Sequence, residues 1–178
     1  MTVAAVVLAA GASTRFGSPK QRVLLPLVLE RVRAARAVDD VLVVLGAHDV
    51  DTDTCTVRCP DWERGPGASL RCGLGALGPE VEAAVVVLAD GPDLAPEAVD
   101  RVVAAWREGG GDVVAATYGG VRLHPLLLAR NAWESVPEAG LRSLPAALVP
   151  CDDLPSPGDV DSAEDWRERR RASRTESE

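Results

Sequence analysis

The sequence has few aromatic residues and no long apolar segment. Phe, Trp and Tyr together make up 3% of the 178 residues, although 47% of the chain is hydrophobic. The interior must therefore be packed from Ala, Val and Leu, which suits an α/β domain. Apolar runs such as residues 3–10 are far shorter than the roughly 20 residues that cross a bilayer. We expect a soluble protein with one core, the usual outcome at this length.

Basic charge is also scarce. The formal net charge is −8, from 19 basic and 27 acidic residues. Proteins that bind nucleic acid or membrane surfaces without specificity draw on an excess of Lys and Arg. We therefore expect no nucleic-acid and no membrane partner, and an anionic ligand must be held by a local basic cluster.

Cysteine is present but not in a pattern that indicates a metal or redox site. The four cysteines, Cys55, Cys59, Cys72 and Cys151, form no CxxC pair, and the chain has no signal-peptide pattern. We predict reduced thiols without a special role in a cytoplasmic protein.

Lysine is nearly absent. Of the 19 basic residues, 18 are Arg, and Lys20 is the one exception. An ammonium is a compact point charge, whereas the guanidinium of Arg is a planar fork. Lys20 is thus a candidate for a position that needs the point charge, unless it survives by chance.

Short Val-rich runs alternate with segments of helical spacing. The runs predict strands over residues 3–9, 41–45, 83–88 and 113–116, and the spacing predicts helices over 27–37, 68–77 and 97–107. This alternation indicates a Rossmann-like three-layer α/β sandwich, a mostly parallel sheet with helices on both faces.

The second half of the chain is less regular. Residues 118–129 predict an extended or hairpin segment, and residues 162–170 predict a terminal helix with Ser162 or Asp161 as its N-cap. We predict one domain over residues 1–170 and a disordered tail over 171–178.

The loop after the first strand has the composition of a phosphate cradle. Small residues let backbone N–H groups approach an anion, and two basic side chains supply charge. The candidate nucleotide-binding residues of this loop are Leu8, Ala9, Ala10, Gly11, Ala12, Ser13, Arg15 and Lys20. The spacing fits neither GxxxxGK[ST] nor GxGxxG, and the first acid at a suitable place, Asp49, comes too late for a dinucleotide site.

This loop also resembles a family signature. Leu8-Ala-Ala-Gly-Ala-Ser-Thr-Arg-Phe-Gly with Lys20 is similar to the LAAGxSxRxGxxK motif of nucleotidyltransferases related to the molybdenum cofactor cytidylyl- and guanylyltransferases. Four further stretches resemble family motifs in the same order: Trp62-Glu-Arg-Gly-Pro-Gly-Ala-Ser69-Leu-Arg, Asp90-Gly-Pro92, His124-Pro125 and Asp159-Val-Asp161-Ser-Ala-Glu-Asp165.

The resemblance implies a magnesium-dependent transfer of a nucleoside monophosphate from its triphosphate to a phosphate-bearing acceptor. It implies Mg²⁺ on Asp90 and Asp161, with Asp159 as the alternative to Asp161, and Mg²⁺ indeed prefers carboxylate oxygens. Arg15, Lys20 and Asp90 would be catalytic, Ser69 would contact the base or ribose, and His124 would contact the acceptor.

Each of these residues also has an ordinary structural reading. Asp90 suits a turn before Gly91-Pro92, Asp161 suits a helix N-cap, Ser69 suits a first helical turn, and His124 suits a structural role.

Two segments depart from the family pattern, and they leave the acceptor open. Leu24–Glu30 runs directly into a helix without the family's Gly-containing turn, and Ala139–Arg142 lacks an acid of the family's motif. The acceptor is either the pterin cofactor of molybdenum enzymes or a small phosphate, phosphonate or sugar phosphate. The alternative outside the enzymes is an accessory protein that binds a nucleotide without catalysing a reaction.

The base preference rests on Ala9-Ala10-Gly11. Related cytidylyltransferases read Ala-Ala-Gly there, whereas the guanylyltransferases read Ala-Gly-Gly or Gly-Gly. The methyl group of Ala10 would suit one pyrimidine ring better than a purine, which predicts CTP over GTP as the donor. Packing of Ala10 against the first strand, with the base read near Ser69, is the alternative.

Overall fold

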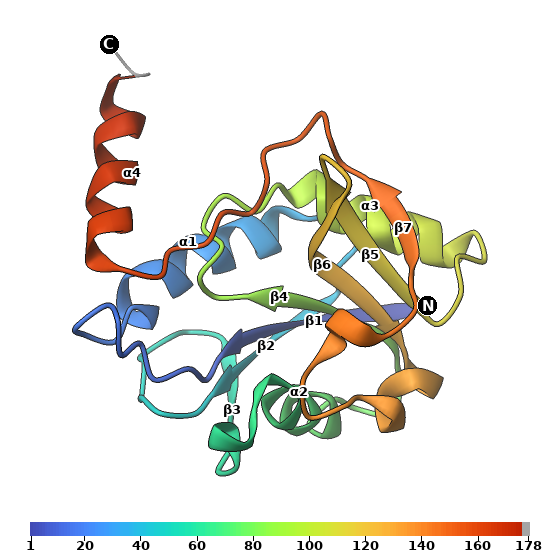
Figure 1. The fold of residues 1–178 in the computed structure, drawn as a ribbon. Coiled ribbons are helices and arrows are strands. Elements are labelled where there is room, and N and C mark those ends of the chain that lie inside the picture. The colour runs from blue at the N-terminus through green and yellow to red at the C-terminus, as the bar shows by residue number, and fades with distance from the viewer. Residues whose placement is uncertain (176–178) are drawn as a thin grey trace.

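The structure is a computed structural model that describes residues 1–175 (Figure 1). Seven strands form one sheet, and they are β1 (Thr2–Ala9), β2 (Asp40–Leu45), β3 (Cys55–Arg58), β4 (Val81–Leu88), β5 (Val113–Tyr118), β6 (Val121–Ala129) and β7 (Ala147–Pro150). The α-helices are α1 (Gln21–Ala34), α2 (Pro66–Gly75), α3 (Pro96–Arg107) and α4 (Ala163–Thr175). Three short 3-10 helices are η1 (Trp62–Arg64), η2 (Arg130–Ser135) and η3 (Leu141–Ser143).

The sheet is mostly parallel, as the sequence predicts. Its strand order is β3-β2-β1-β4-β6-β5-β7, and only β6 runs antiparallel to its neighbours. In the register of the sheet, Leu8 of β1 pairs with Val44 of β2 and with Leu88 of β4. The loops that follow these strands therefore leave the sheet at one edge.

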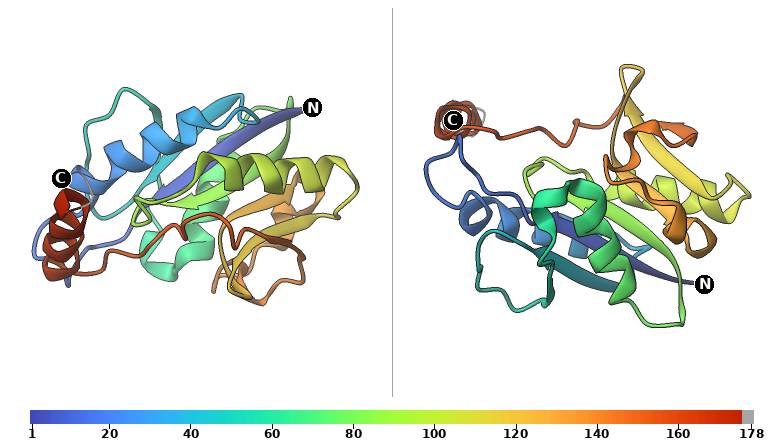
Figure 2. Two further views of the ribbon diagram at one scale, coloured as in Figure 1. Left: turned by 90° about the horizontal axis from the view of Figure 1, so that it is seen from above. Right: turned by 60° about the horizontal axis from the view of Figure 1, so that its bottom comes forward.

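Helices cover both faces of the sheet. Figure 2 shows α1 and α3 on one side, whereas α2 lies on the other. The first face packs Val and Ala side chains of β1 and β4 against α1 and α3, and the second face packs Val6, Val44 and Val86 against Leu70 and Leu74 of α2. The Rossmann-like three-layer prediction is confirmed.

The first helix begins earlier than predicted, at Gln21 rather than Leu27. Its buried side chains recur at helical spacing from before the predicted start onward, and they include Leu24, Leu25, Val28, Leu29 and Val32. Pro26 lies on the exposed side of the helix. The regular apolar face thus outweighs the Pro as a boundary signal.

Two edge strands, β3 and β7, were not predicted. Each has four residues, and neither shows a continuous buried run, because both lie at the margin of the sheet. The segment 118–129 is a hairpin strand as expected, with the turn at Gly119 and Gly120.

The prediction of four reduced thiols is wrong for two of them. Cys59 and Cys72 form a disulfide, and their Cα atoms lie 5.6 Å apart, whereas Cys55 and Cys151 are free. The two cysteines of the pair are 13 residues apart in the chain, and the fold of α2 against the end of β3 brings them together. Sequence spacing alone does not reveal that contact.

The terminal helix continues past its predicted end at Arg170, as far as Thr175, because no Gly or Pro interrupts it. The predicted tail is therefore helical over 171–175, and residues 176–178 lie outside the described part. Ser162 is the N-cap: its Oγ accepts from the Asp165 N–H at 3.1 Å, and its own N–H donates to the Asp165 carboxylate at 2.8 Å. Within residues 1–175, no helix is both long and apolar enough to cross a membrane.

Candidate active site

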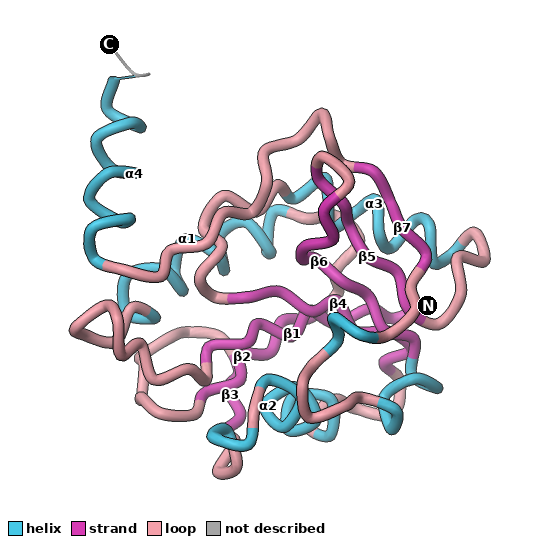
Figure 3. The backbone as a smooth tube through the Cα atoms, in the orientation of Figure 1, coloured by secondary structure: helices cyan, strands magenta, loops and turns pink. Residues whose placement is uncertain are grey.

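Three segments that are distant in sequence meet at the carboxyl edge of the sheet. They are the loop after β1, the turn after β4 that holds Asp90, and the segment 159–161 before α4. Figure 3 shows the loop after β1 and the segment leading into α4 beside each other. Open α/β sheets bind their ligands at such an edge.

Lys20 joins these segments. Its Nζ donates to Asp90 Oδ2 at 3.1 Å and to the Val160 carbonyl at 2.9 Å, and it lies 3.5 Å from Asp161 Oδ1. The Lys20 side chain is only 14% exposed. One compact ammonium thus faces three oxygens, which the planar fork of Arg would meet in a different geometry.

Arg15 supplies a second positive charge to the same place. Its NH1 lies 2.9 Å from Asp161 Oδ2, and its side chain is 76% exposed. A guanidinium that is so exposed remains available to a phosphate that enters from solvent.

Three carboxylates gather around Lys20. One oxygen each from Asp90, Asp159 and Asp161 lies within 4.8 Å of the others. Partial burial, and then the negative charges of Asp90 and Asp161, raise the pKa of Asp159. Such crowded oxygen donors fit a hard divalent cation, which would relieve their repulsion.

The loop after β1 is held by side chains that the sequence analysis did not single out. Gln21 is 3% exposed, its Nε2 donates to the Gly11 carbonyl at 2.6 Å, and its Oε1 accepts from Ser13 Oγ at 2.8 Å. Ser13 Oγ also accepts from the Lys20 N–H at 3.3 Å, and Ser13 has a φ of 54°. His48 places its Nε2 at 2.8 Å from the Ala12 carbonyl.

Gln21 and His48 thus fix the backbone of the cradle before any ligand arrives. The sequence signal that could have identified Gln21 is its position: a polar residue directly after Lys20, at a buried position of the helix.

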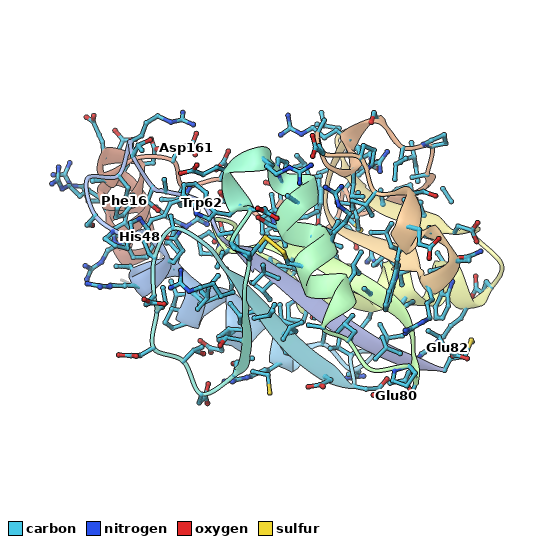
Figure 4. The ribbon with its side chains drawn as sticks, turned by 90° about the horizontal axis from the view of Figure 1, so that it is seen from below. Phe16, His48, Trp62, Glu80, Glu82 and Asp161 are labelled. Atoms are coloured by element: carbon cyan, nitrogen blue, oxygen red, sulfur yellow. A yellow bond between two sulfur atoms is a disulfide. The ribbon has the colours of Figure 1, made fainter. Side chains whose placement is uncertain are left out.

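A cleft of about 180 Å³ lies between these groups. Of the predicted residues, eight line it: Leu8, Ala9, Gly11, Ser13, Arg15, Lys20, Asp90 and Asp161. Ala10 and Ala12 do not, and the Ala10 carbonyl instead accepts from the Ala47 N–H at 3.0 Å. Figure 4 shows Asp161, Phe16 and His48 at the same end of the molecule.

Besides Ala10 and Ala12, two further predicted residues, Ser69 and His124, lie outside this cleft. Ser69 is 4% exposed in the first turns of α2 and lines neither this cleft nor the neighbouring one. His124 is 5% exposed, because β6 turns its side chain inward beside Gly91. Burial lowers the pKa of His124 to about 4, although the charge of Asp90 partly opposes this, and the ring is neutral near pH 7.

The geometry fits the binding and transfer of a phosphate group. Two cationic side chains line the cleft beside a loop of small residues, and carboxylates able to hold a metal lie next to them. Phosphoryl chemistry needs positive charge where negative charge develops, and it needs no covalent nucleophile.

Solved structures share this fold over nearly the whole chain. Rv0371c from Mycobacterium tuberculosis H37Rv is 27% identical, with a TM-score of 0.76 over 94% of this chain and 97% of that one. Its homologue from Mycobacterium sp. strain JC1 is also 27% identical, with a TM-score of 0.79 over 99% and 98% of the two chains.

Two further similar structures are complexes with a ligand. A manganese complex of Rv0371c matches at 24% identity, with a TM-score of 0.72 over 94% of this chain and 97% of that one. A CMP:2-keto-3-deoxy-manno-octonic acid synthetase complexed with CTP shares the fold at 12% identity, with a TM-score of 0.74 over 99% and 100% of the chains.

Among curated proteins, no match is found. Residues 5–150 match the model of the MobA-like NTP transferase domain. This match spans most of the chain and includes the loop after β1, Lys20 and Asp90. The protein therefore belongs to the MobA-like NTP transferase family and is a nucleotidyltransferase.

Proposed function

We propose that this nucleotidyltransferase transfers CMP from CTP to a phosphate-type oxygen of a small acceptor in the presence of Mg²⁺. The observation that carries the proposal is the contact of Lys20 with both Asp90 and Asp161 at the mouth of the β1 loop. It unites the cationic and the acidic parts of the site in one cleft.

In the proposed reaction, an oxygen of the acceptor forms a bond to the α-phosphorus of CTP, and the bond from that phosphorus to pyrophosphate breaks. The products are a CMP-linked acceptor and pyrophosphate. Arg15 and Lys20 hold the charge of the triphosphate and of the leaving pyrophosphate, and N–H groups near Gly11 and Ser13 contact phosphate oxygens. His124 contacts the acceptor.

Asp90 and Asp161 are the proposed ligands of the metal, and Asp159 is close enough to be a third. A divalent cation bound there supplies positive charge to phosphate oxygens in the transition state. The similar protein Rv0371c has been solved as a complex with manganese, which supports a divalent-metal site in this fold.

CTP is the proposed donor because of Ala10. Its side chain is 7% exposed, so its methyl group acts on the shape of the backbone that faces the nucleotide rather than through an open surface. The CTP complex of the distantly similar synthetase agrees in donor but shares only the fold.

The experiment is a measurement of pyrophosphate release from each of CTP, GTP, ATP and UTP with Mg²⁺. Candidate acceptors are molybdopterin, simple phosphates, phosphonates and sugar phosphates. Release that requires both CTP and an acceptor is expected. Tight nucleotide binding without release under any combination would instead favour an accessory protein that does not turn over.

A further inference from the structure

A second cleft of about 370 Å³ adjoins the first, and Leu8 lines both. Hydrocarbon side chains make up most of its lining. They come from α2, β4, β6 and the η3 segment, and they include Leu70, Val86, Leu88, Leu126 and Leu141. Leu88 is 39% exposed, which is unusual for a large apolar side chain of this molecule.

The polar groups of this cleft come mainly from one face of β6. Arg122 and His124 are two residues apart on the strand, and both line the cleft. Arg122 donates to the carbonyls of Leu144 at 2.6 Å and Leu141 at 3.0 Å, and so ties down the η3 segment that forms a wall.

Several donors and acceptors of these two side chains are left over. Among the described residues, Nε of Arg122 and both ring nitrogens of His124 are buried without a hydrogen-bond partner. Buried polar groups are rarely left unpaired, and each unpaired one asks for an explanation. Both side chains line this cleft, but these nitrogens are themselves buried, so a bound ligand would become their partner only if the Arg122 or His124 side chain turned toward it.

The polar end of the cleft lies next to the acidic site. A Cβ added to Gly91 would lie 2.5 Å from Nε2 of His124, so the ring packs directly on the residue after Asp90. The apolar floor is also joined to the site, since Leu88 precedes Asp90 by two residues. In Figure 1 the β1 loop and β6 lie on different sides of the end of β4. A molecule in the second cleft therefore reaches Asp90 from the side away from Arg15.

That approach suits the acceptor. In an in-line transfer, the attacking oxygen and the leaving pyrophosphate stand on opposite sides of the phosphorus. With pyrophosphate held by the β1 loop, the acceptor enters from the side of β6.

We infer that the acceptor is an amphiphilic phosphate. Its anionic oxygen lies at Arg122 and His124, and its body is a hydrocarbon, aryl or branched aliphatic, that packs on the leucine floor. A polyhydroxylated sugar phosphate would leave hydroxyl groups against hydrocarbon, where they lack hydrogen bonds. This inference rests on the proposed function for the reaction, but it can be tested by binding alone.

The test compares two probes that share a phosphate and differ in the body. Binding of 1-naphthyl phosphate and of glucose 1-phosphate to the full chain is measured by calorimetry with Mg²⁺. Each titration is run with and without a CTP analogue that has a methylene group between the α- and β-phosphorus atoms and therefore cannot react. We expect naphthyl phosphate to bind at least tenfold more tightly than glucose 1-phosphate, and the analogue to leave this binding in place.

A pair of variants locates the preference. Leu88→Gln should reduce the preference for 1-naphthyl phosphate over glucose 1-phosphate to less than threefold, because the substitution puts an amide into the apolar floor of the cleft. Leu148→Gln is the matched control: Leu148 is 58% exposed on the edge strand β7 and does not line the cleft, so the preference should be unchanged.

Three results would overturn the inference. They are equal or tighter binding of glucose 1-phosphate, a preference that Leu88→Gln does not alter, and displacement of naphthyl phosphate by the CTP analogue, which would assign the cleft to the nucleoside. Failure of the proposed function looks different: no pyrophosphate release with any nucleotide and acceptor, while the selective binding of naphthyl phosphate persists.

Discussion

Lys20 shows what a single residue contributes at this site. Its ammonium contacts Asp90, in the turn after β4, and Asp161, directly before α4. These residues are 70 and 141 positions away in the sequence, so Lys20 links three distant parts of the chain. The sequence indicated Lys20 by its rarity and by the family motif, and in the structure Lys20 lines the cleft.

We predict that Lys20→Ala and Arg15→Ala each lower turnover much more than stability. A charge-assisted hydrogen bond is worth about 1.5 to 3 kcal/mol, which is roughly a tenfold to hundredfold loss in rate when it is made to the reacting phosphates. The ion pair of the exposed Arg15 contributes little to folding, at most about 1 kcal/mol. Pyrophosphate release and urea denaturation measure the two effects.

Lys20→Arg is the informative control for this experiment. It keeps the positive charge but replaces the compact ammonium with a planar guanidinium. Turnover should therefore lie between that of Lys20→Ala and that of the unmodified protein. If Lys20→Ala released pyrophosphate at the rate of the unmodified protein, Lys20 would not be part of the active site.

Asp90→Asn and Asp161→Asn should abolish activity and weaken Mg²⁺ binding while the domain stays folded. Asn is nearly the same size as Asp, so the change removes charge from the carboxylate group near Lys20. Calorimetric titration of Mg²⁺ measures the loss, and Asp51→Asn, an exposed carboxylate between β2 and β3, serves as the control. If both site variants bind Mg²⁺ normally, the metal is held elsewhere.

The donor base is tested by titrating CTP, GTP, ATP and UTP into the magnesium-loaded protein. One methyl group in a tight pocket is worth on the order of 1 to 3 kcal/mol, so at least a tenfold preference for CTP is expected. Ala10→Gly should narrow that preference, because it removes the buried methyl group that fixes the shape of the backbone facing the nucleotide. Tighter binding of GTP than of CTP by the unmodified protein would end the cytidylyl reading.

At the scale of elements, hydrophobic periodicity predicted the buried strands and helices but missed the strands at the edges of the sheet. The buried strands β1, β2, β4 and β5 and the helices α2 and α3 have strong apolar patterns, and they were found within a few residues of their ends. The edge strands β3 and β7 have mixed burial and no such pattern. Their place is set by pairing with a neighbour that is distant in sequence, which a local pattern does not encode.

The disulfide between Cys59 and Cys72 connects the end of β3 with α2. It closes a short loop, and in the chain-entropy view a loop of this size stabilises the folded state by about 3 kcal/mol. We therefore expect a reducing agent, or the variant Cys72→Ser, to lower the free energy of unfolding by roughly 2 to 4 kcal/mol in a denaturant titration. Cys55→Ser should have no such effect because that thiol is exposed and free. An unfolding curve that does not respond to reduction would show that the link does not stabilise the fold.

At the scale of the whole molecule, the candidate site depends on both ends of the described chain. Arg15 and Lys20 lie near the start, and Asp161 lies near the end, directly before α4. The order of motifs was enough to bring these residues together in the sequence analysis. The parts that escaped it are the supports of the loop, Gln21 and His48, and the burial of Ser69 and His124, since each depends on a tertiary contact or a direction that no motif specifies.

Because Lys20 lies in the candidate site, the rate of its chemical modification reports on what is bound there. Acylating reagents attack primary amines, and the sequence offers them one lysine, which is 14% exposed between two carboxylates. The amine of Met1 is paired with Glu82 at 3.7 Å, and Figure 4 shows Glu82 at the end of the molecule opposite Asp161. Mass spectrometry after brief acetylation can thus follow Lys20 separately from Met1. We expect magnesium, which competes for the carboxylates, to speed modification of Lys20, and magnesium with CTP to suppress it, while the rate at Met1 stays constant.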